Sequence, residues 1–181
     1  DLDSPGGPVE SSVEIAKTIG DYTACPIVVH VSKEALSGGA IASLGSPTIV
    51  MERGTVIGAS QVIMTVPGQD GPIQPAPEKF ASVVRAVVRT LAQNNGYPEA
   101  VCEAMVDPDL QVHKVTMQDG SVRYLKQNEL EKLQDSVDRR QIRDERVICP
   151  KGQLLTLTEK EALEYGIAKA VVANREETIR M

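Results

Sequence analysis

Residues 26–45 limit the folds open to this chain more than any other segment. A short β-branched run follows Pro26 and ends at Val31, which is typical of a buried strand. Between residues 37 and 45, small residues surround Ile41 and Leu44, a pattern that suits a helix packed close against a sheet. We therefore expect a strand that leads into a closely packed helix, which is one unit of an α/β fold.

Ser37 lies where this strand is expected to turn into the helix. At a helix N-terminus, unpaired backbone NH groups and the positive end of the helix dipole stabilise a developing anion. Ser37 is therefore a candidate nucleophile. The alternative is an ordinary N-cap serine followed by a turn that Gly38 and Gly39 soften, and the residues by themselves leave this alternative open.

Strands and helices are expected to alternate along the whole chain, so the predicted class is α/β, with βα units whose helices pack on a sheet. The helix over 78–94 has the clearest apolar period, with Arg85 and Arg89 on its other side. Its predicted buried stripe is Phe80, Val83, Val84, Val87 and Leu91. The other expected elements are helices over 9–19, 98–105, 127–144 and from 158, strands over 48–52, 153–156 and 170–173, a hairpin over 110–124, turns over 1–8 and 54–60, and a mobile surface loop over 67–77.

Length and composition fit one globular domain with an aliphatic core. The 181 residues include one Phe, four Tyr and no Trp. A formal net charge of -6 argues against a general nucleic-acid surface. The three cysteines have no CxxC spacing, so we expect no zinc site and no disulfide framework. No cofactor is expected. No run of about 18 apolar residues and no signal peptide is present, so the chain is expected to be soluble.

Lysine is the better candidate for a base than histidine. His30 lies within the apolar strand and is expected to be a satisfied core residue, while His113 is expected at an exposed position of the hairpin. Lys79 lies in the first turn of the helix over 78–94, at the edge of its apolar stripe. Lys33 competes with it, but we expect Lys33 to be a solvated loop charge.

A lysine acts as a base only as the uncharged amine. An ordinary lysine, with a pKa of about 10.4, is protonated at neutral pH. Apolar neighbours and a helix N-terminus both disfavour the ammonium form, and the start of the helix offers both to Lys79. Glu78 would act in the opposite direction if its carboxylate approached the amine. The alternative is a surface lysine at a helix start.

A series of short motifs resembles the ClpP-class serine peptidases. Within that class the chain is most similar to the membrane-associated NfeD family, relatives of signal peptide peptidase A. The resemblance covers most of residues 1–108 and 150–175, and the order and spacing of the motifs make it specific. The motifs are Asp3-Ser4-Pro5-Gly6-Gly7 before a helix, the strand of residues 26–31, Ala35-Leu36-Ser37-Gly38-Gly39-Ala40, Gly54-Thr55-Val56-Ile57-Gly58-Ala59, Lys79 with its helix, 95–100 with 103–108, and 154–158 with 161–166.

The resemblance implies a ClpP/crotonase-type fold and a serine endopeptidase that works through a Ser-Lys dyad and an acyl-enzyme. Ser37 would be the nucleophile and Lys79 the general base, and the NH groups of Gly7 and Gly38 would form the oxyanion hole. Where ClpP carries its triad histidine, this chain has Ser60-Gln61, which favours lysine.

The expected substrate is a peptide or protein that is cleaved in an apolar segment. Membrane proteins are among the expected substrates. Gly6 would lie beside the substrate, and Val62, Ile63 and Met64 could line an apolar groove, although a buried strand explains these three equally well. The resemblance also implies a homo-oligomer, a dimer or larger. It implies membrane association through segments absent from this chain, which could lie on the extracytoplasmic side.

Three departures from the family leave other functions open. Family members have strands before the Pro-Gly-Gly turn, and this chain is expected to lack them, so the sheet could be incomplete or the sequence a fragment. The family's usual membrane-spanning and small β-barrel portions are also absent. Residues 109–149, predicted as a hairpin and a charged helix, have no clear counterpart and are interpreted as an insertion in a single domain over 1–181, which could be inert, an oligomerisation arm or a substrate gate. The alternatives are a crotonase-type acyl-CoA enzyme and a catalytically idle ClpP-like scaffold.

Overall fold

The computed structural model describes residues 1–64 and 74–181. Its strands are β1 (Leu2–Ser4), β2 (Val28–Leu36), β3 (Thr48–Glu52), β4 (Val56–Gly58), β5 (Ile63–Met64), β6 (Gln74–Pro75), β7 (Val112–Met117), β8 (Val122–Lys126), β9 (Ile142–Cys149), β10 (Thr156–Thr158) and β11 (Ala170–Val172). Its helices are α1 (Val9–Asp21), α2 (Gly38–Ser43), α3 (Glu78–Asn95), α4 (Glu99–Ala104), α5 (Gln127–Gln134), α6 (Glu159–Glu164) and α7 (Arg175–Arg180), with a 3-10 turn at Val137–Gln141. Most of the predicted loop over 67–77 lies outside the described residues, and its last part forms β6.

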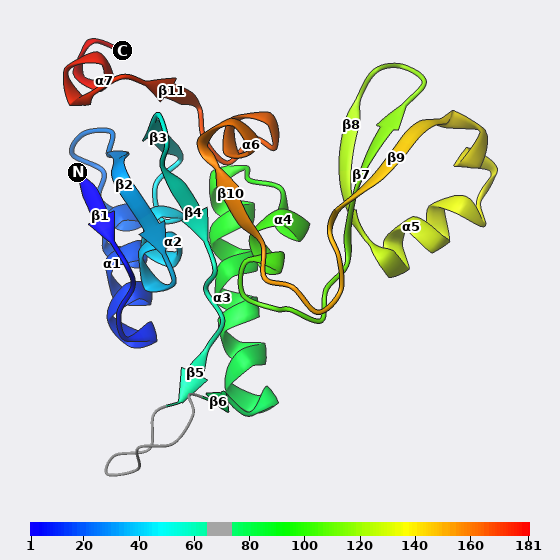
Figure 1. The fold of residues 1–181 in the computed structure, drawn as a ribbon, viewed down its shortest axis with the longest axis horizontal. Coiled ribbons are helices and arrows are strands. Elements are labelled where there is room, and N and C mark those ends of the chain that lie inside the picture. The colour runs from blue at the N-terminus through cyan, green and yellow to red at the C-terminus, as the bar shows by residue number, and fades with distance from the viewer. Residues whose placement is uncertain (65–73) are drawn as a thin grey trace.

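β2 is the central strand of the main sheet (Figure 1), whose order is β10-β4-β2-β3-β11 with β1 beside β2. Its first half pairs with β3 and its second half pairs with β4, both in parallel. β1 pairs in parallel with β2, and β11 pairs in parallel with β3. β10 pairs with β4 and is antiparallel to it. The side chains of Val29, Val31 and Ala35 on β2 belong to the main core. The predicted α/β class is therefore confirmed.

The short helix α2 packs closely, as its small residues predict. All its residues are buried, and it contacts both β2 and α1. A Cβ added to Gly45, just after the helix, would lie 2.2 Å from the backbone oxygen of Ala16 on α1. Only a glycine allows the two helices to approach this closely, and this contact fixes the end of α2 that lies away from Ser37.

The buried face of α3 differs from the predicted stripe. Val84, Val88, Leu91 and Ala92 are buried, whereas Phe80 and Val83 are 46% and 60% exposed. Valines occupy positions 83, 84, 87 and 88, so the sequence is compatible with two overlapping stripes. Packing against α1 and α4 selects the second stripe, and the first turn of α3 extends beyond the buried core.

Residues 112–149 form the β7–β9 subdomain, a three-stranded antiparallel sheet of order β8-β7-β9 with α5 against it (Figure 1). It has its own small core of Val115, Met117 and Leu130. The predicted helix over 127–144 is wrong beyond Gln134, because a 3-10 turn follows at Val137–Gln141 and the chain from Ile142 onward pairs with β7 as strand β9. The predicted hairpin is confirmed. That the segment is an insertion stays a prediction.

Several other boundaries also differ from expectation. β1 occupies part of the predicted turn over 1–8, so one strand does precede the Pro-Gly-Gly turn. The predicted turn over 54–60 contains β4, and the strand expected over 153–156 is β10, two or three residues later. The sequence did not predict α7. The capping box of Thr158 and Glu161 is confirmed.

Candidate active site

Ser37 occupies a strained turn between the end of β2 and the start of α2. Its φ of 51° and ψ of -122° lie in a region that side chains disfavour. Among the described residues, Ala59 is the other non-glycine residue with positive φ, and it follows the neighbouring strand β4. Such strain persists only where the surroundings fix the backbone, and it is concentrated at functional sites.

Gly58 at the end of β4 and Ser60 just after it hold this turn in place. The Ser37 NH donates to the carbonyl of Gly58 at 2.9 Å. The Ser60 hydroxyl donates to the carbonyl of Ser37 at 2.8 Å, and the Ser60 NH donates to the carbonyl of Met105 at 2.6 Å. Ser60 is 3% exposed. Sequence reasoning treated Ser60 only as a missing histidine, although a small polar residue directly after Gly58-Ala59 was the available signal.

The predicted glycines lie close to Ser37, and Gly6 lies beside its side chain. A Cβ added to Gly6 would lie 2.6 Å from Cβ and 3.0 Å from Oγ of Ser37, so the Gly6 backbone runs directly beside the hydroxyl. A Cβ added to Gly38 would lie 3.1 Å from the nitrogen of Gly7, so these two glycines are neighbours. Within the described part of the chain, the NH groups of Gly7 and Gly38 donate no hydrogen bond. The structure thus brings Ser37, Gly6, Gly7 and Gly38 together, and the oxyanion hole stays a prediction.

Lys79 lies in the first turn of α3, as predicted, but it is exposed. Its Nζ is 5.4 Å from the centroid of the Phe80 ring. Among the described residues it makes no ion pair, and no hydrogen bond joins it to Ser37. The expected burial among aliphatic side chains is therefore wrong, because this turn of α3 extends beyond the core. That Lys79 acts on Ser37 stays a prediction.

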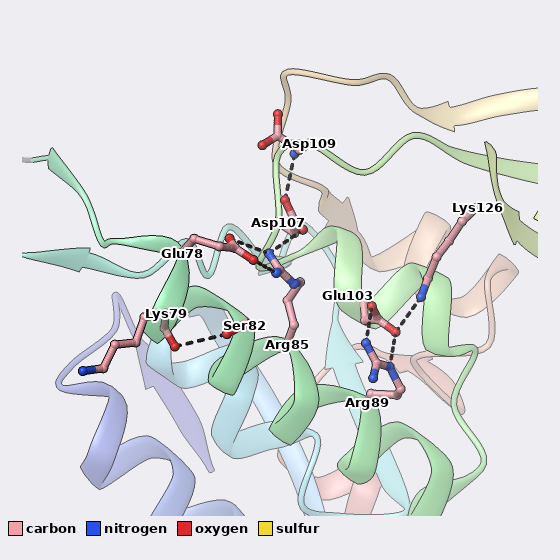
Figure 2. Close-up of polar contacts among 9 residues, drawn as sticks. All are labelled: Glu78, Lys79, Ser82, Arg85, Arg89, Glu103, Asp107, Asp109 and Lys126. Carbon is pink, nitrogen blue, oxygen red and sulfur yellow. Dashed lines mark hydrogen bonds and ion pairs between the residues drawn. The ribbon is translucent and has the colours of Figure 1, made fainter. Parts of the chain in front are cut away.

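Beside Lys79, an ion-pair chain anchors the start of α3 (Figure 2). The guanidinium of Arg85 hydrogen-bonds both oxygens of Glu78 and, at 2.8 Å, the carboxylate of Asp107. Asp107 also accepts the NH of Asp109 at 2.9 Å. The hydrogen bond to Glu78 raises the pKa of Arg85, and Asp107 adds to this effect against the cost of burial.

A second ionic cluster joins α3, α4 and β8 (Figure 2). Glu103 on α4 is 2% exposed and accepts hydrogen bonds from Arg89 and Lys126, each at 2.8 Å. Burial opposes ionisation of this carboxyl, but the hydrogen bonds and charges of the two cations outweigh it and lower the pKa of Glu103. Lys126 thereby ties the β7–β9 subdomain to the main body.

The other candidate bases have structural partners. His30 is buried, as predicted, with Nε2 at 2.9 Å from Glu52 Oε1 and Nδ1 at 2.8 Å from Thr178 Oγ1. The expected exposure of His113 is wrong, because β7 is the central strand of its sheet and His113 is buried beside Gln127. Its Nδ1 is 3.1 Å from Glu145 Oε1, within ion-pair distance but outside hydrogen-bond geometry.

Lys33, the competing base, is solvated as expected, but it lies on β2 and not in a loop. Its Nζ is 3.7 Å from a carboxylate oxygen of Asp3 on β1, and its side chain is 73% exposed.

The predicted substrate residues lie in and before β5. Val62 packs partly against the main core, whereas Ile63 and Met64 are 49% and 45% exposed. The alternative that these residues form a buried strand is therefore wrong for Ile63 and Met64. Their pairing partner is the two-residue strand β6. Their contact with a substrate stays a prediction.

The described part of the chain contains neither a disulfide nor a group of residues arranged to bind a metal ion. Cys25 is exposed, Cys102 and Cys149 are buried, and all three are free thiols. Burial, with the charge of Glu103 adding to it, raises the pKa of the Cys102 thiol. Within the described residues, no group of three or more His, Cys, Asp or Glu residues is arranged to hold a metal ion. None of the described helices combines the length and hydropathy needed to cross a membrane.

The parallel sheet, the glycine-lined serine turn and the flanking helices define a ClpP-like α/β fold. The fold matches two solved mutants of the 1510-N membrane-bound stomatin-specific protease, each with a TM-score of 0.69 and 24% identity over 99% of this chain. One is a serine-to-alanine mutant, of which this chain covers 66%. The other is a lysine-to-alanine mutant in complex with a substrate peptide, of which it covers 62%.

The chain belongs to the family of NfeD1b N-terminal domains, which matches residues 1–146. It is 27% identical to the membrane protein NfeD1b of Bacillus subtilis over 174 residues, or 96% of this chain. It is 33% identical to the membrane-bound protease PH1510 of Pyrococcus horikoshii over 113 residues, or 61% of this chain. The chain spans 31% and 25% of the lengths of these two relatives.

Proposed function

We propose that this chain is a serine peptidase domain in which Ser37 is the nucleophile and Lys79 the general base. The observation that carries the proposal is the strained turn at Ser37, with Gly6 beside its side chain and Gly7 next to Gly38. The relatives support the proposal, since PH1510 is a membrane-bound protease and the solved homologues are serine and lysine mutants of a protease.

The proposed reaction proceeds through an acyl-enzyme. The Lys79 amine takes the proton of Ser37 Oγ, which attacks the carbonyl carbon of the scissile peptide. The NH groups of Gly7 and Gly38 stabilise the negative charge on the carbonyl oxygen. The Lys79 ammonium then protonates the leaving amine, the C–N bond breaks, and water hydrolyses the ester with Lys79 again as base.

The proposed substrate is an apolar segment of a protein, including segments of membrane proteins. Ile63, Met64 and Phe80 are each about half exposed, and they lie on β5 and on the same turn of α3 as Lys79. A bound apolar segment would cover this surface and remove water from the amine, which favours the uncharged form that a base needs. The lysine mutant of 1510-N was solved with a substrate peptide.

The partners proposed for the domain follow the same resemblance. We propose a homo-oligomer, a dimer or larger, and membrane association through segments outside this chain, on the extracytoplasmic side. NfeD1b is named a membrane protein and PH1510 a membrane-bound protease. A nucleic-acid partner is not proposed, because the net charge is -6.

The second candidate is a catalytically idle scaffold of the same fold. The exposed position of Lys79, with no hydrogen bond to Ser37, favours this candidate. A fluorophosphonate probe, which phosphonylates an activated serine and releases fluoride, separates the two, because an unactivated serine reacts slowly.

The test is labelling of Ser37 by this probe, with the modified residue identified by mass spectrometry. A peptidase predicts labelling that Ser37→Ala removes and that Lys79→Ala slows by about a hundredfold or more. Lys33→Ala is the matched control. Lys33 is an exposed lysine like Lys79, and it lies close to Ser37 in sequence. Equal labelling rates in Lys79→Ala and the unmodified chain would contradict the dyad, and absent labelling would favour the scaffold.

A further inference from the structure

Glu78, the residue before the proposed base, pairs with Arg85. Glu78 is 73% exposed, so its side chain is free to adopt many positions in water. In the structure, both of its carboxylate oxygens accept hydrogen bonds from Arg85. The side chain of Arg85 is itself only 20% exposed and also pairs, at 2.8 Å, with Asp107, which is 10% exposed. Arg85 is therefore the more buried partner of this pair and Glu78 the more exposed one.

The helix geometry explains why this pairing separates Glu78 from Lys79. Arg85 follows Glu78 by seven residues, or about two turns, so the two side chains share one face of α3. Lys79 is rotated from Glu78 by about 100° around the helix axis. Figure 2 shows the Lys79 side chain extending away from the side where Glu78, Arg85 and Asp107 meet.

A released Glu78 carboxylate would change the chemistry of the amine. A carboxylate near a lysine favours the charged ammonium and raises the pKa of the lysine. At a fixed neutral pH, a higher pKa leaves less of the uncharged amine that can accept the serine proton. A Glu78 carboxylate released from Arg85 would therefore lower the fraction of uncharged Lys79 amine. A Glu78 carboxylate bound to Arg85 would not.

The other charged groups around this part of α3 either bind other partners or make no ion pair with Lys79. On α4, Glu103 is held by Arg89 and Lys126, and Glu99 accepts a hydrogen bond from Gln93. The charged residues of α1, which also packs on α3, make no ion pair with Lys79 in the described structure: Glu10, Glu14, Lys17 and Asp21. Glu78 is therefore the carboxylate next to Lys79 in sequence, and Arg85 is the partner that holds it.

We propose that Arg85, braced by Asp107, is a positioning residue that holds the Glu78 carboxylate away from Lys79 and so keeps the amine available as a base. The base role rests on the proposed function, but the restraint of Glu78 does not. Arg85 touches neither the substrate nor the serine and acts only through Glu78.

The test measures the ionisation of Lys79 directly, by NMR titration of the chain with 13C-labelled lysine side chains. The Lys79 signal is the one missing from Lys79→Arg. Arg85→Met should raise the pKa of Lys79 by about half a unit, since exposed ion pairs contribute fractions of a kcal/mol. The double variant Glu78→Gln/Arg85→Met should return it to the value of the unmodified chain, and Glu78→Gln by itself should change it little.

Two further variants separate positioning from general loosening of α3. Arg89→Met removes the next arginine along the same helix and should lower the melting temperature without moving the Lys79 titration. Arg85→Lys keeps a positive charge beside Asp107 but loses the planar fork that binds two carboxylates, so it should fold and give a smaller rise. An unchanged titration in Arg85→Met, or a rise that Glu78→Gln does not reverse, overturns the proposal.

The peptidase readout then reports on the base role. If the unmodified chain labels at Ser37, the acid limb of the pH profile of kcat/KM should move upward in Arg85→Met, with about a threefold loss of activity below it. The Glu78→Gln change should restore it. A shifted titration in a chain that is not labelled would retain the restraint and reject the proposed function, so the two failures are distinguishable.

Discussion

The two residues of the proposed dyad are supported in opposite ways. The Ser37 turn is fixed by the hydrogen bond that its NH donates to Gly58 on β4, by the one that its carbonyl accepts from Ser60, and by the Gly6 backbone beside its side chain. Lys79 lies on an exposed turn, with a ring contact to Phe80 and an ion-pair chain beside it. If Ser37 and Lys79 act as proposed, the nucleophile is rigid, and water and neighbouring charges on α3 can change the reactivity of the base.

The largest expected effect comes from crowding the rigid half. Gly6→Ala places a Cβ 2.6 Å from Cβ of Ser37, at a φ of 125° that side chains rarely adopt. We expect the labelling rate of Ser37 to fall by about a hundredfold or more, as for loss of oxyanion-hole geometry. Gly20→Ala is the control, because its Cβ would meet its nearest neighbour at an ordinary 3.5 Å. Unchanged labelling in Gly6→Ala would show that the turn is not rigid.

A smaller effect is expected from loosening the same turn. Ser60→Ala removes the hydroxyl that donates to the Ser37 carbonyl, and loss of one buried hydrogen bond costs about 1–2 kcal/mol. We expect kcat to fall about tenfold, with KM unchanged, because that energy converts to such a factor if it acts on the transition state.

The matched control for Ser60 is Ser43→Ala. Ser43 is also buried, and its hydroxyl donates at 2.8 Å to the carbonyl of Gly39 within α2. It should lower the melting temperature to a similar extent while kcat is kept. If both variants lose kcat equally, the role of Ser60 is no more than general stability.

The exposed apolar residues of β5 should affect KM more than kcat, because they are proposed to bind the substrate. Ile63→Ser and Met64→Ser should each raise KM for an apolar peptide about threefold, because each removes part of an apolar contact of about 1 kcal/mol. Ile179→Ser changes an exposed residue of α7, which lies at the other end of the molecule (Figure 1), and should leave KM unchanged. An equal rise in Ile179→Ser would remove the assigned surface.

The smallest effect on Ser37 is expected from Glu103, whose role is stability. Glu103→Gln should lower the free energy of unfolding by about 2 kcal/mol, a buried ion-pair value discounted for the partly exposed Arg89 and Lys126, and leave labelling unchanged. The pKa of Glu103 is lowered in the folded chain, so its contribution is present above the unfolded pKa and is lost as pH falls through the folded value. Urea unfolding at a series of acid pH values measures this loss, which Glu103→Gln should abolish.

The sequence predicted those parts that depend on short-range pattern. The Ser37 turn followed from a β-branched run and small residues, and the start of α3 and the Thr158 cap followed from helix signals. It missed β9, because a charged segment with helical composition is decided by pairing with β7, which is distant in sequence. His113 was predicted as exposed for the same reason.

The site could be predicted only where residue type carries the chemistry. A serine beside glycines is recognisable, and so is a lysine at a helix start. The hydrogen bond from Ser60 to Ser37 joins residues 23 apart, and that from Arg85 to Asp107 joins residues 22 apart, so neither has a local signature. The exposure of Lys79 also depends on tertiary packing, because two valine stripes on α3 were available and the fold selected one.

The sharing of β2 among three strands has a consequence for the order in which the molecule opens. β1, β3 and β4 all pair with β2, so its amide hydrogens can exchange with solvent only when much of the sheet separates. The first turn of α3 has no such constraint and should exchange early. On gentle warming, the chain should therefore lose the geometry of the lysine well before that of the serine, and inactivation should precede the cooperative melting of the sheet.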